Sequence, residues 1–246
     1  MNKLKINNHE ISKENTPFII AEAGINHNGS VEKAVEMVKT AKNAGVSAIK
    51  FQTFKAHEFI SDSSLTYTYT SQGKSITESQ LDLFKRCELS NDDFYKIKKT
   101  CDEEKIIFLS TPQNKSDLDF LLELGISAIK VGSDDFTNIP LLKYYSKTKL
   151  PILISCGMTT LKEIKTTLTA IGTLDGYPTA LLLTTSEYPT PPQNVNLQKL
   201  RTLSQKFPDI TLGYSDHTQG NLASTVAISF GACIFERHFT LDNSLS

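Results

Sequence analysis

The chain has 246 residues, of which 39% are hydrophobic and 22% charged, with a net charge of −1 at pH 7. This balance offers neither the basic surface that binds nucleic acid nor a polybasic membrane anchor, so we expect small-molecule partners, no nucleic acid and no membrane. No apolar run has the length of a membrane-spanning helix, and Met1-Asn2-Lys3-Leu4 opens no secretory signal. These features predict a cytoplasmic protein.

Apolar, β-rich runs recur along the chain and alternate with segments of helical spacing. Near-continuous Ile, Val and Leu runs between amphipathic helices are typical of parallel strands covered by helices. Eight such units favour a (β/α)₈ TIM barrel over an open doubly wound sheet, and no G-x-G-x-x-G follows any of them. The predicted strands are residues 18–23, 48–53, 106–111, 128–133, 151–156, 179–186, 211–216 and 233–240.

Two segments depart from this rhythm. Residues 56–90 contain a long polar stretch after the second strand, on the face where barrel active sites lie, which indicates either a lid or a surface insertion. The chain stops at Ser246, soon after the eighth strand, with no eighth helix. We therefore expect one barrel domain, residues 1–246, that is truncated after strand eight and incomplete at its C-terminus.

Polar side chains cluster at the carboxyl ends of the predicted strands, where TIM barrels place their catalytic groups. The repetition from strand to strand carries more information than any single member. These candidates are Glu22, Lys50, Gln52, Thr111, Lys130, Ser133, Ser155, Ser186, Tyr188, Ser215, His217, Glu236 and His238.

Among them, His217 and His238 end the last two strands, so neighbouring parallel strands would place the two imidazoles side by side. Closure of the barrel would bring Glu22 of the first strand next to His238. Two imidazoles with added substrate oxygens suit Mn²⁺ or a similar divalent cation better than a closed zinc site. The alternative is that the histidines form only hydrogen bonds in the barrel mouth. His27 could join them, or could simply belong to an Asn- and Gly-rich turn.

The lysines of the second and fourth strands, Lys50 and Lys130, belong to even-numbered strands, which contribute to the same interior layer. Two such ammonium groups, with nearby hydroxyls, would form a cradle for an anion bearing phosphate and carboxylate. Simple rim charges are the alternative. After the sixth strand, three prolines stiffen the loop and could hold Tyr188 over the mouth. The hydroxyls of the cradle are those of Thr111, Ser133, Ser155 and Ser215.

In these motifs the chain resembles the sialic acid synthase family, whose members condense phosphoenolpyruvate with an N-acylated amino sugar to make nine-carbon sugar acids. The matching stretches follow the family order across nearly the whole chain. They are residues 20–29, 50–55, 110–112, 130–133, 155–158, 187–191, 214–218 and 236–240.

The resemblance implies a role for each matching position. His217 and His238 match the metal-holding histidines, usually for Mn²⁺, with Mg²⁺ or Co²⁺ as alternatives. Glu22 matches the acid-base glutamate, and Gln52 and Tyr188 match positions that contact the sugar; Ser186 is a further substrate-binding candidate. The positions that match the phosphoenolpyruvate ligands are Lys50, Thr111, Lys130, Ser133, Ser155 and Ser215.

The resemblance also implies a homodimer of the full-length protein. The family's Gly-Pro-Asp motif and its small antifreeze-like C-terminal domain lie outside residues 1–246, and Cys156 stands where the family usually has threonine. Two other functions remain open: a Schiff-base aldolase or lyase acting through Lys130 or Lys50 on a keto acid, and a non-catalytic sugar-phosphate-binding fragment.

Overall fold

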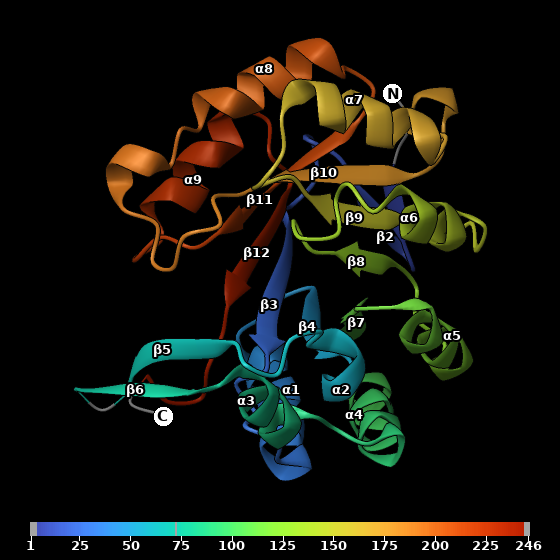
Figure 1. Ribbon diagram of the computed structural model, residues 1–246. Coiled ribbons are helices and arrows are strands. Elements are labelled where there is room, and N and C mark those ends of the chain that lie inside the picture. Colours follow the sequence, from blue (N-terminus) through green and yellow to red (C-terminus); the bar gives the residue numbers. More distant parts are fainter. Residues whose placement is uncertain (1–3, 72, 244–246) are drawn as a thin grey trace.

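A computed structural model describes residues 4–71 and 73–243. Eight parallel strands form one sheet in the order β7-β4-β3-β12-β11-β10-β9-β8, and the end strands β7 and β8 pack against each other. The sheet is a nearly closed barrel with helices around it, so the predicted TIM barrel is confirmed (Figure 1). Its strands are β3 (Phe18–Gly24), β4 (Ala48–Thr53), β7 (Ile107–Pro112), β8 (Ile129–Val131), β9 (Ile152–Ser155), β10 (Thr179–Leu183), β11 (Thr211–Asp216) and β12 (Ile234–His238).

The helices lie between the strands, and their sequences explain where they begin and which face is buried. In the first, Ser30 accepts a hydrogen bond from the Lys33 N–H as the N-cap. Ala34, Met37, Val38 and Ala41 then form the buried stripe at helical spacing. The helices are α1 (Val31–Asn43), α2 (Ala56–Phe59), α3 (Gln80–Cys87), α4 (Asn91–Glu103), α5 (Lys115–Leu124), α6 (Ile139–Ser146), α7 (Leu161–Ala170), α8 (Gln198–Lys206) and α9 (Leu222–Ser229).

Alternation along each strand separates two hydrophobic clusters. Along β12, Ile234 belongs to the cluster inside the barrel and Phe235 to the cluster between sheet and helices. Glu236 and His238 continue the inward face and line a cavity above the interior cluster. The period of two in a strand thus places charged groups directly above an apolar floor.

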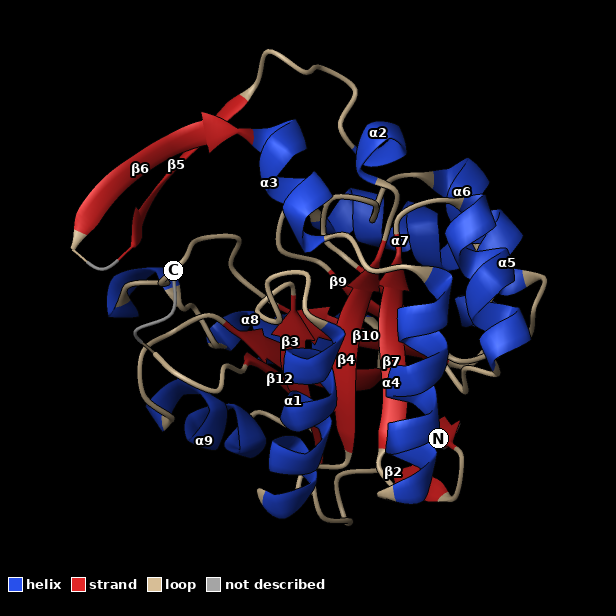
Figure 2. Ribbon diagram, turned by 90° about the horizontal axis from the view of Figure 1, so that it is seen from below, coloured by secondary structure: helices blue, strands red, loops and turns tan. Residues whose placement is uncertain are grey.

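The N-terminal residues form a short hairpin of β1 (Leu4–Ile6) and β2 (His9–Ile11), which no sequence pattern predicts. Leu4, Ile6 and Ile11 are buried in the same cluster as the inward side chains of the barrel strands. Figure 2 shows the hairpin at the end of the barrel away from α2 and α3. It closes the amino-terminal end of the barrel.

The described residues of the predicted insertion form helices and strands. The insertion contains α2, a projecting antiparallel hairpin of β5 (Thr66–Ser71) and β6 (Lys74–Ser79), and α3. Arg86 of α3 forms an ion pair with Glu78 of β6 at 2.7 Å, which ties the hairpin to the helix. In Figure 2, α2 and α3 lie beyond the carboxyl ends of β4 and β7, while the hairpin extends to one side.

The described residues after β12 form no helix, and the outer face of β12 and β3 carries an apolar groove of about 410 Å³. Ile19 and Ile228 line this groove and are 42% and 50% exposed. The four cysteines are buried free thiols. No described helix combines the length and the hydrophobicity that crossing a membrane requires.

Candidate active site

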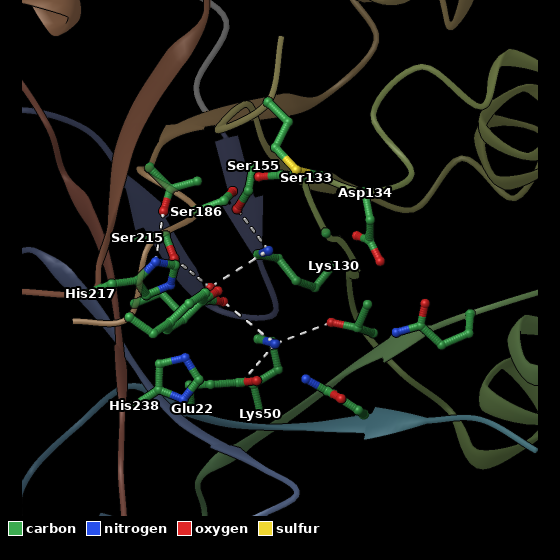
Figure 3. Close-up of a pocket in the computed structure, with 18 of the residues that line it drawn as sticks. Glu22, Lys50, Lys130, Ser133, Asp134, Ser155, Ser186, Ser215, His217 and His238 are labelled. Carbon is green, nitrogen blue, oxygen red and sulfur yellow. Dashed lines mark hydrogen bonds and ion pairs between the residues drawn. The ribbon is translucent and has the colours of Figure 1, made fainter. Parts of the chain in front are cut away.

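A cavity of about 320 Å³ opens at the carboxyl ends of the strands, within the range of small-molecule sites. Every candidate residue from the sequence lines it, so the structure brings the predicted set together (Figure 3). The lining also includes side chains that no sequence pattern singles out. Among them are Phe59, Phe84, Gln113 and Asp134. Met158, in the matching stretch 155–158, lines the cavity as well.

The floor of the cavity holds Lys50 and Lys130 on either side of one carboxylate. Lys50 Nζ lies 3.7 Å from Glu236 Oε2, and Lys130 Nζ lies 3.6 Å from Glu236 Oε1. Lys50 Nζ also lies 2.7 Å from Glu22 Oε2. All four side chains are buried, and both lysines point into the cavity (Figure 3). The expected convergence of the two ammonium groups is therefore present.

Burial and charge act against each other in this cluster. Burial raises the pKa of Glu22 to about 7, although Lys50 lowers it. Burial would also raise the pKa of Glu236, but Lys130 and Lys50 outweigh it and the net shift is downward. For Lys50, burial acts to lower the pKa, but the two carboxylates raise it above its ordinary value. Glu236 is therefore ionised at neutral pH. The pKa of Glu22 beside it lies near neutral pH, so Glu22 can gain or lose a proton there.

Hydroxyl groups surround the ammonium groups. Lys50 donates to Thr111 Oγ1 at 3.1 Å, and Lys130 donates to Ser155 Oγ at 2.9 Å. Ser215 donates to Glu236 Oε1 at 2.9 Å. These hydroxyl and ammonium groups form a compact cradle, and such groups bind phosphate or carboxylate.

Gly157 follows β9 and allows one wall of the cradle to close. Its N–H donates to Ser133 Oγ at 2.9 Å. A Cβ on Gly157 would lie 2.7 Å from both Ser186 Oγ and Thr184 Cγ2, and 3.0 Å from Ser133 Oγ. Only glycine fits between these three side chains without moving them.

The two histidines lie beside each other at the mouth, with ring centroids 5.4 Å apart. Backbone register pairs His238 with Glu22 across β12 and β3, as barrel closure predicts. His217 Nδ1 lies 2.8 Å from the Thr185 carbonyl oxygen. Because a carbonyl only accepts, Nδ1 carries the proton and Nε2 keeps its lone pair.

The histidine pair fits a divalent cation. Burial lowers the pKa of both imidazoles, that of His238 to about 4, so both are neutral and able to act as ligands. A carbonyl that orients the far ring nitrogen is the usual support of a metal-binding histidine. Among the described residues, no cluster of three His, Cys, Asp or Glu side chains is suited to a metal. The remaining ligands of such an ion would be water and substrate oxygens.

His27 does not join this pair. It is buried beside Phe51, with ring centroids 6.0 Å apart, and its Nδ1 accepts a hydrogen bond from the Gly29 N–H. Its place is the turn after β3, outside the residues that line the cavity.

Tyr188 forms one side of the mouth. Its ring lies 4.0 Å from that of His217 and 5.5 Å from that of His238, measured between centroids. The Thr190 N–H donates to the His217 carbonyl, which fixes the proline-rich loop over β11. The structure therefore places Tyr188 where its sequence context indicates, at the entrance.

Known proteins resemble this chain in sequence and in fold. The sequence matches the NeuB family over residues 37–246. It is 40% identical over 235 residues to the N,N'-diacetyllegionaminic acid synthase of Legionella pneumophila, covering 94% of this chain and 65% of that protein. It is 36% identical to the N-acetylneuraminate-9-phosphate synthase of Drosophila melanogaster, covering 92% of this chain and 61% of that protein. The chain thus spans less than two thirds of the length of these relatives.

The fold of this chain also matches a solved crystal structure. The crystal structure of the N-acetylneuraminic acid synthetase of Leptospira borgpetersenii, in complex with citrate, superposes with a TM-score of 0.88 at 31% sequence identity. The match covers 98% of this chain and 79% of that one.

Proposed function

Because the chain belongs to the NeuB family, we propose that it is the barrel of a nonulosonate synthase. In this proposal it condenses phosphoenolpyruvate with an N-acylated amino sugar aldehyde and releases phosphate. The observation that carries the proposal is the pair Lys50 and Lys130, buried with hydroxyl groups in a cavity that two neutral histidines also line.

Phosphoenolpyruvate suits the floor because it bears a phosphate and a carboxylate. Lys50 and Lys130 supply the positive charge, and the hydroxyls of Thr111, Ser155 and Ser215 supply further hydrogen bonds. Glu236 keeps the two ammonium groups apart and charged before the anion arrives. Charge placed in advance stabilises the phosphate as it becomes a leaving group.

His217 and His238 would hold the divalent cation, for which Mn²⁺ is our first candidate. Bound there, it would supply Lewis acidity to the aldehyde oxygen of the sugar. Burial keeps both imidazoles neutral. The Thr185 carbonyl fixes the tautomer of His217.

The sugar would occupy the upper cavity. Gln52, Ser186 and Tyr188 line the cavity and offer an amide, a hydroxyl and an aromatic face. They would orient the aldehyde carbon toward the floor, so that the methylene carbon of phosphoenolpyruvate attacks it. The C=C electron pair forms the C–C bond, the aldehyde C=O π bond opens, and its oxygen takes up a proton.

Water then adds to the former enol carbon, and the C–O bond to phosphate breaks, which releases inorganic phosphate. Glu22 is buried beside Lys50, and its pKa of about 7 would allow it to accept the proton of the attacking water. The sum of the steps consumes one water and yields a nine-carbon acid and phosphate.

The test is phosphate release by the full chain with phosphoenolpyruvate, Mn²⁺ and a panel of N-acyl amino sugar aldehydes. We expect release that stops on treatment with a chelator and returns on addition of Mn²⁺. Phosphate release from none of the sugars, with correctly folded protein, would rule out a synthase.

A Schiff-base aldolase is the second candidate, because burial lowers the pKa of Lys130 and so favours a nucleophilic amine. Against it, the Lys130 ammonium already donates to Ser155 Oγ and the Val131 carbonyl. Borohydride reduction with a keto acid, followed by mass spectrometry, separates the two: a trapped adduct on Lys130 or Lys50 supports the aldolase.

A further inference from the structure

An ion pair joins β11 and β12 on the face of the two strands opposite to the histidine pair. Backbone register pairs Asp216 of β11 with Arg237 of β12, and these residues immediately precede His217 and His238 in the chain. Because side chains alternate along a strand, they point away from the face that carries the imidazoles. In agreement, His217 and His238 line the cavity, whereas Arg237 lines the groove on the outer face of β12 and β3.

Asp216 closes a turn around His217. Its Oδ1 accepts a hydrogen bond from the Thr218 N–H at 2.8 Å, so His217 is the central residue of the turn. A side chain that accepts from the second N–H along the chain mimics a backbone turn. The Thr190 N–H donates to the His217 carbonyl, and the Thr185 carbonyl binds its ring. The backbone that carries this imidazole is therefore held from both sides.

Arg237 binds the second oxygen of Asp216 and the loop after His217. Its Nη1 lies 3.1 Å from Asp216 Oδ2 and also donates to the Gly220 carbonyl. Its Nη2 donates to the Thr218 carbonyl at 2.9 Å. One planar guanidinium thus joins β12 to three acceptors on β11 and its loop, and a single lysine ammonium group cannot reproduce this fork.

Ser224 adds a contact from α9, which packs beside β11 (Figure 1). Its hydroxyl donates to Asp216 Oδ2, the oxygen that Arg237 also binds. The Asp216 side chain is fully buried, and that of Arg237 is 34% exposed. One buried carboxylate therefore receives donors from the turn, from β12 and from α9, and its loss would leave all three without their acceptor.

We propose that Asp216 and Arg237 are positioning residues: from behind the two strands, their ion pair fixes the distance between the two imidazoles that would hold the divalent cation. Each member of the pair is the chain neighbour of one histidine, so loosening the pair lets one imidazole move relative to the other. An ion bound by both imidazoles requires them at a fixed separation. This inference rests on the metal-binding role of the histidine pair in the proposed function.

The experiment measures Mn²⁺ binding by electron paramagnetic resonance, which needs no turnover. Asp216→Asn keeps the shape of the side chain but removes its charge and one acceptor. Arg237→Lys keeps the charge but not the fork. Each variant should weaken Mn²⁺ binding about tenfold, the lower end of the loss caused by outer groups of metal sites. Calorimetric binding of phosphoenolpyruvate to the metal-free variants should be unchanged, because Lys50 and Lys130 are untouched.

The double variant tests whether the two residues act as one unit. If they do, Asp216→Asn with Arg237→Lys should weaken Mn²⁺ binding about tenfold, as each single variant does, whereas independent effects would multiply to about 100-fold. Two exposed control variants should leave Mn²⁺ binding unchanged. Asp102→Asn breaks an ion pair with Lys98 on α4, and Arg201→Lys changes an arginine of α8.

The metal-free protein gives a second readout. Nitrogen NMR of labelled histidine should show one tautomer of His217 in the parent, with the proton on Nδ1, and a mixture in Arg237→Lys. Unchanged Mn²⁺ affinity in both single variants, independent effects in the double variant, or equal losses of Mn²⁺ and phosphoenolpyruvate binding would overturn the inference and leave the synthase function standing. A parent protein that binds no Mn²⁺ would overturn both the metal role of the histidines and this inference.

Discussion

The carboxylate of Glu22 lies 2.7 Å from the ammonium group of Lys50, and both side chains are almost completely buried on neighbouring strands. Burial raises the pKa of Glu22 from 4.5 to about 7, while Lys50 opposes the shift. A carboxyl group with this pKa can gain or lose a proton at physiological pH, which an ordinary glutamate does not do.

The ionisation of Glu22 should therefore set the lower pH limit of phosphate release. As the base for water, it is active when ionised, so kcat/KM for phosphate release should rise as pH increases through about 7. Glu22→Gln should lower kcat by about 100- to 10,000-fold and remove this limb of the profile. Glu36→Gln, on the exposed face of α1, is the control. A full pH limb in Glu22→Gln would exclude Glu22 as the base.

The histidine pair predicts the metal requirement. His217→Ala and His238→Ala should each weaken Mn²⁺ binding by at least about 100-fold, since loss of a supporting group alone costs up to that much. Electron paramagnetic resonance measures free Mn²⁺ directly and needs no turnover. His57→Ala removes an exposed imidazole and should leave binding unchanged. Undiminished Mn²⁺ affinity in both site variants would place the metal elsewhere.

Glycine at position 157 should matter for ligand binding in the cradle more than for the stability of the fold. Gly157→Ala puts a methyl group 2.7 Å from Ser186 Oγ and Thr184 Cγ2, which must move Ser133 or Ser186. We expect phosphoenolpyruvate affinity to fall about tenfold in calorimetry, roughly the loss of one hydrogen bond to a charged group. Gly125→Ala is the matched control.

In that control, Gly125 has φ +80° at the end of α5, and apart from its own chain neighbours and helix no described residue has an atom within 4 Å of the position that a Cβ would take. Alanine there should cost about 1 kcal/mol of stability, as a left-handed residue does, without changing ligand affinity. Equal affinities of the Gly157→Ala variant and the parent would show that the wall adapts.

The β1–β2 hairpin should contribute strongly to stability. Ile6 is 0% exposed inside the interior cluster, so Ile6→Ala should lower the free energy of unfolding by about 2–5 kcal/mol. Ile228→Ala, at a residue 50% exposed, should change it by less than about 0.5 kcal/mol. Denaturant titration of both variants measures the difference, and equal effects would mean that the hairpin is not part of the core.

The sequence carries enough information to predict the barrel and most of its site. Continuous apolar runs show the strands, and the alternation of inward and outward side chains places Glu22, Lys50 and His238 on the inner face. The strand order of a closed barrel then makes them neighbours. Each step depends only on local pattern and on one topology rule.

Other features depend on packing that no local pattern shows. β1 and β2 have three residues each, too few for a periodic signal. Glu236 is a strand-end candidate in the sequence, but its position between two lysines follows from side-chain placement across several strands. Phe59 and Phe84 reach the cavity because the insertion folds back over it. For β5 a signal is present, since Thr66–Ser71 alternates Thr and Tyr, residues typical of strands.

The hairpin at the closed end of the barrel has a kinetic consequence. The interior cluster fills the barrel below the cavity, so in the proposed reaction substrates and products would pass the mouth at the carboxyl ends of the strands. In that reaction, phosphoenolpyruvate on the floor would enter before the sugar that covers it, and phosphate would leave after the sugar acid. The proposed synthase would then bind its substrates in a compulsory order, with inorganic phosphate competing directly against phosphoenolpyruvate for the empty protein.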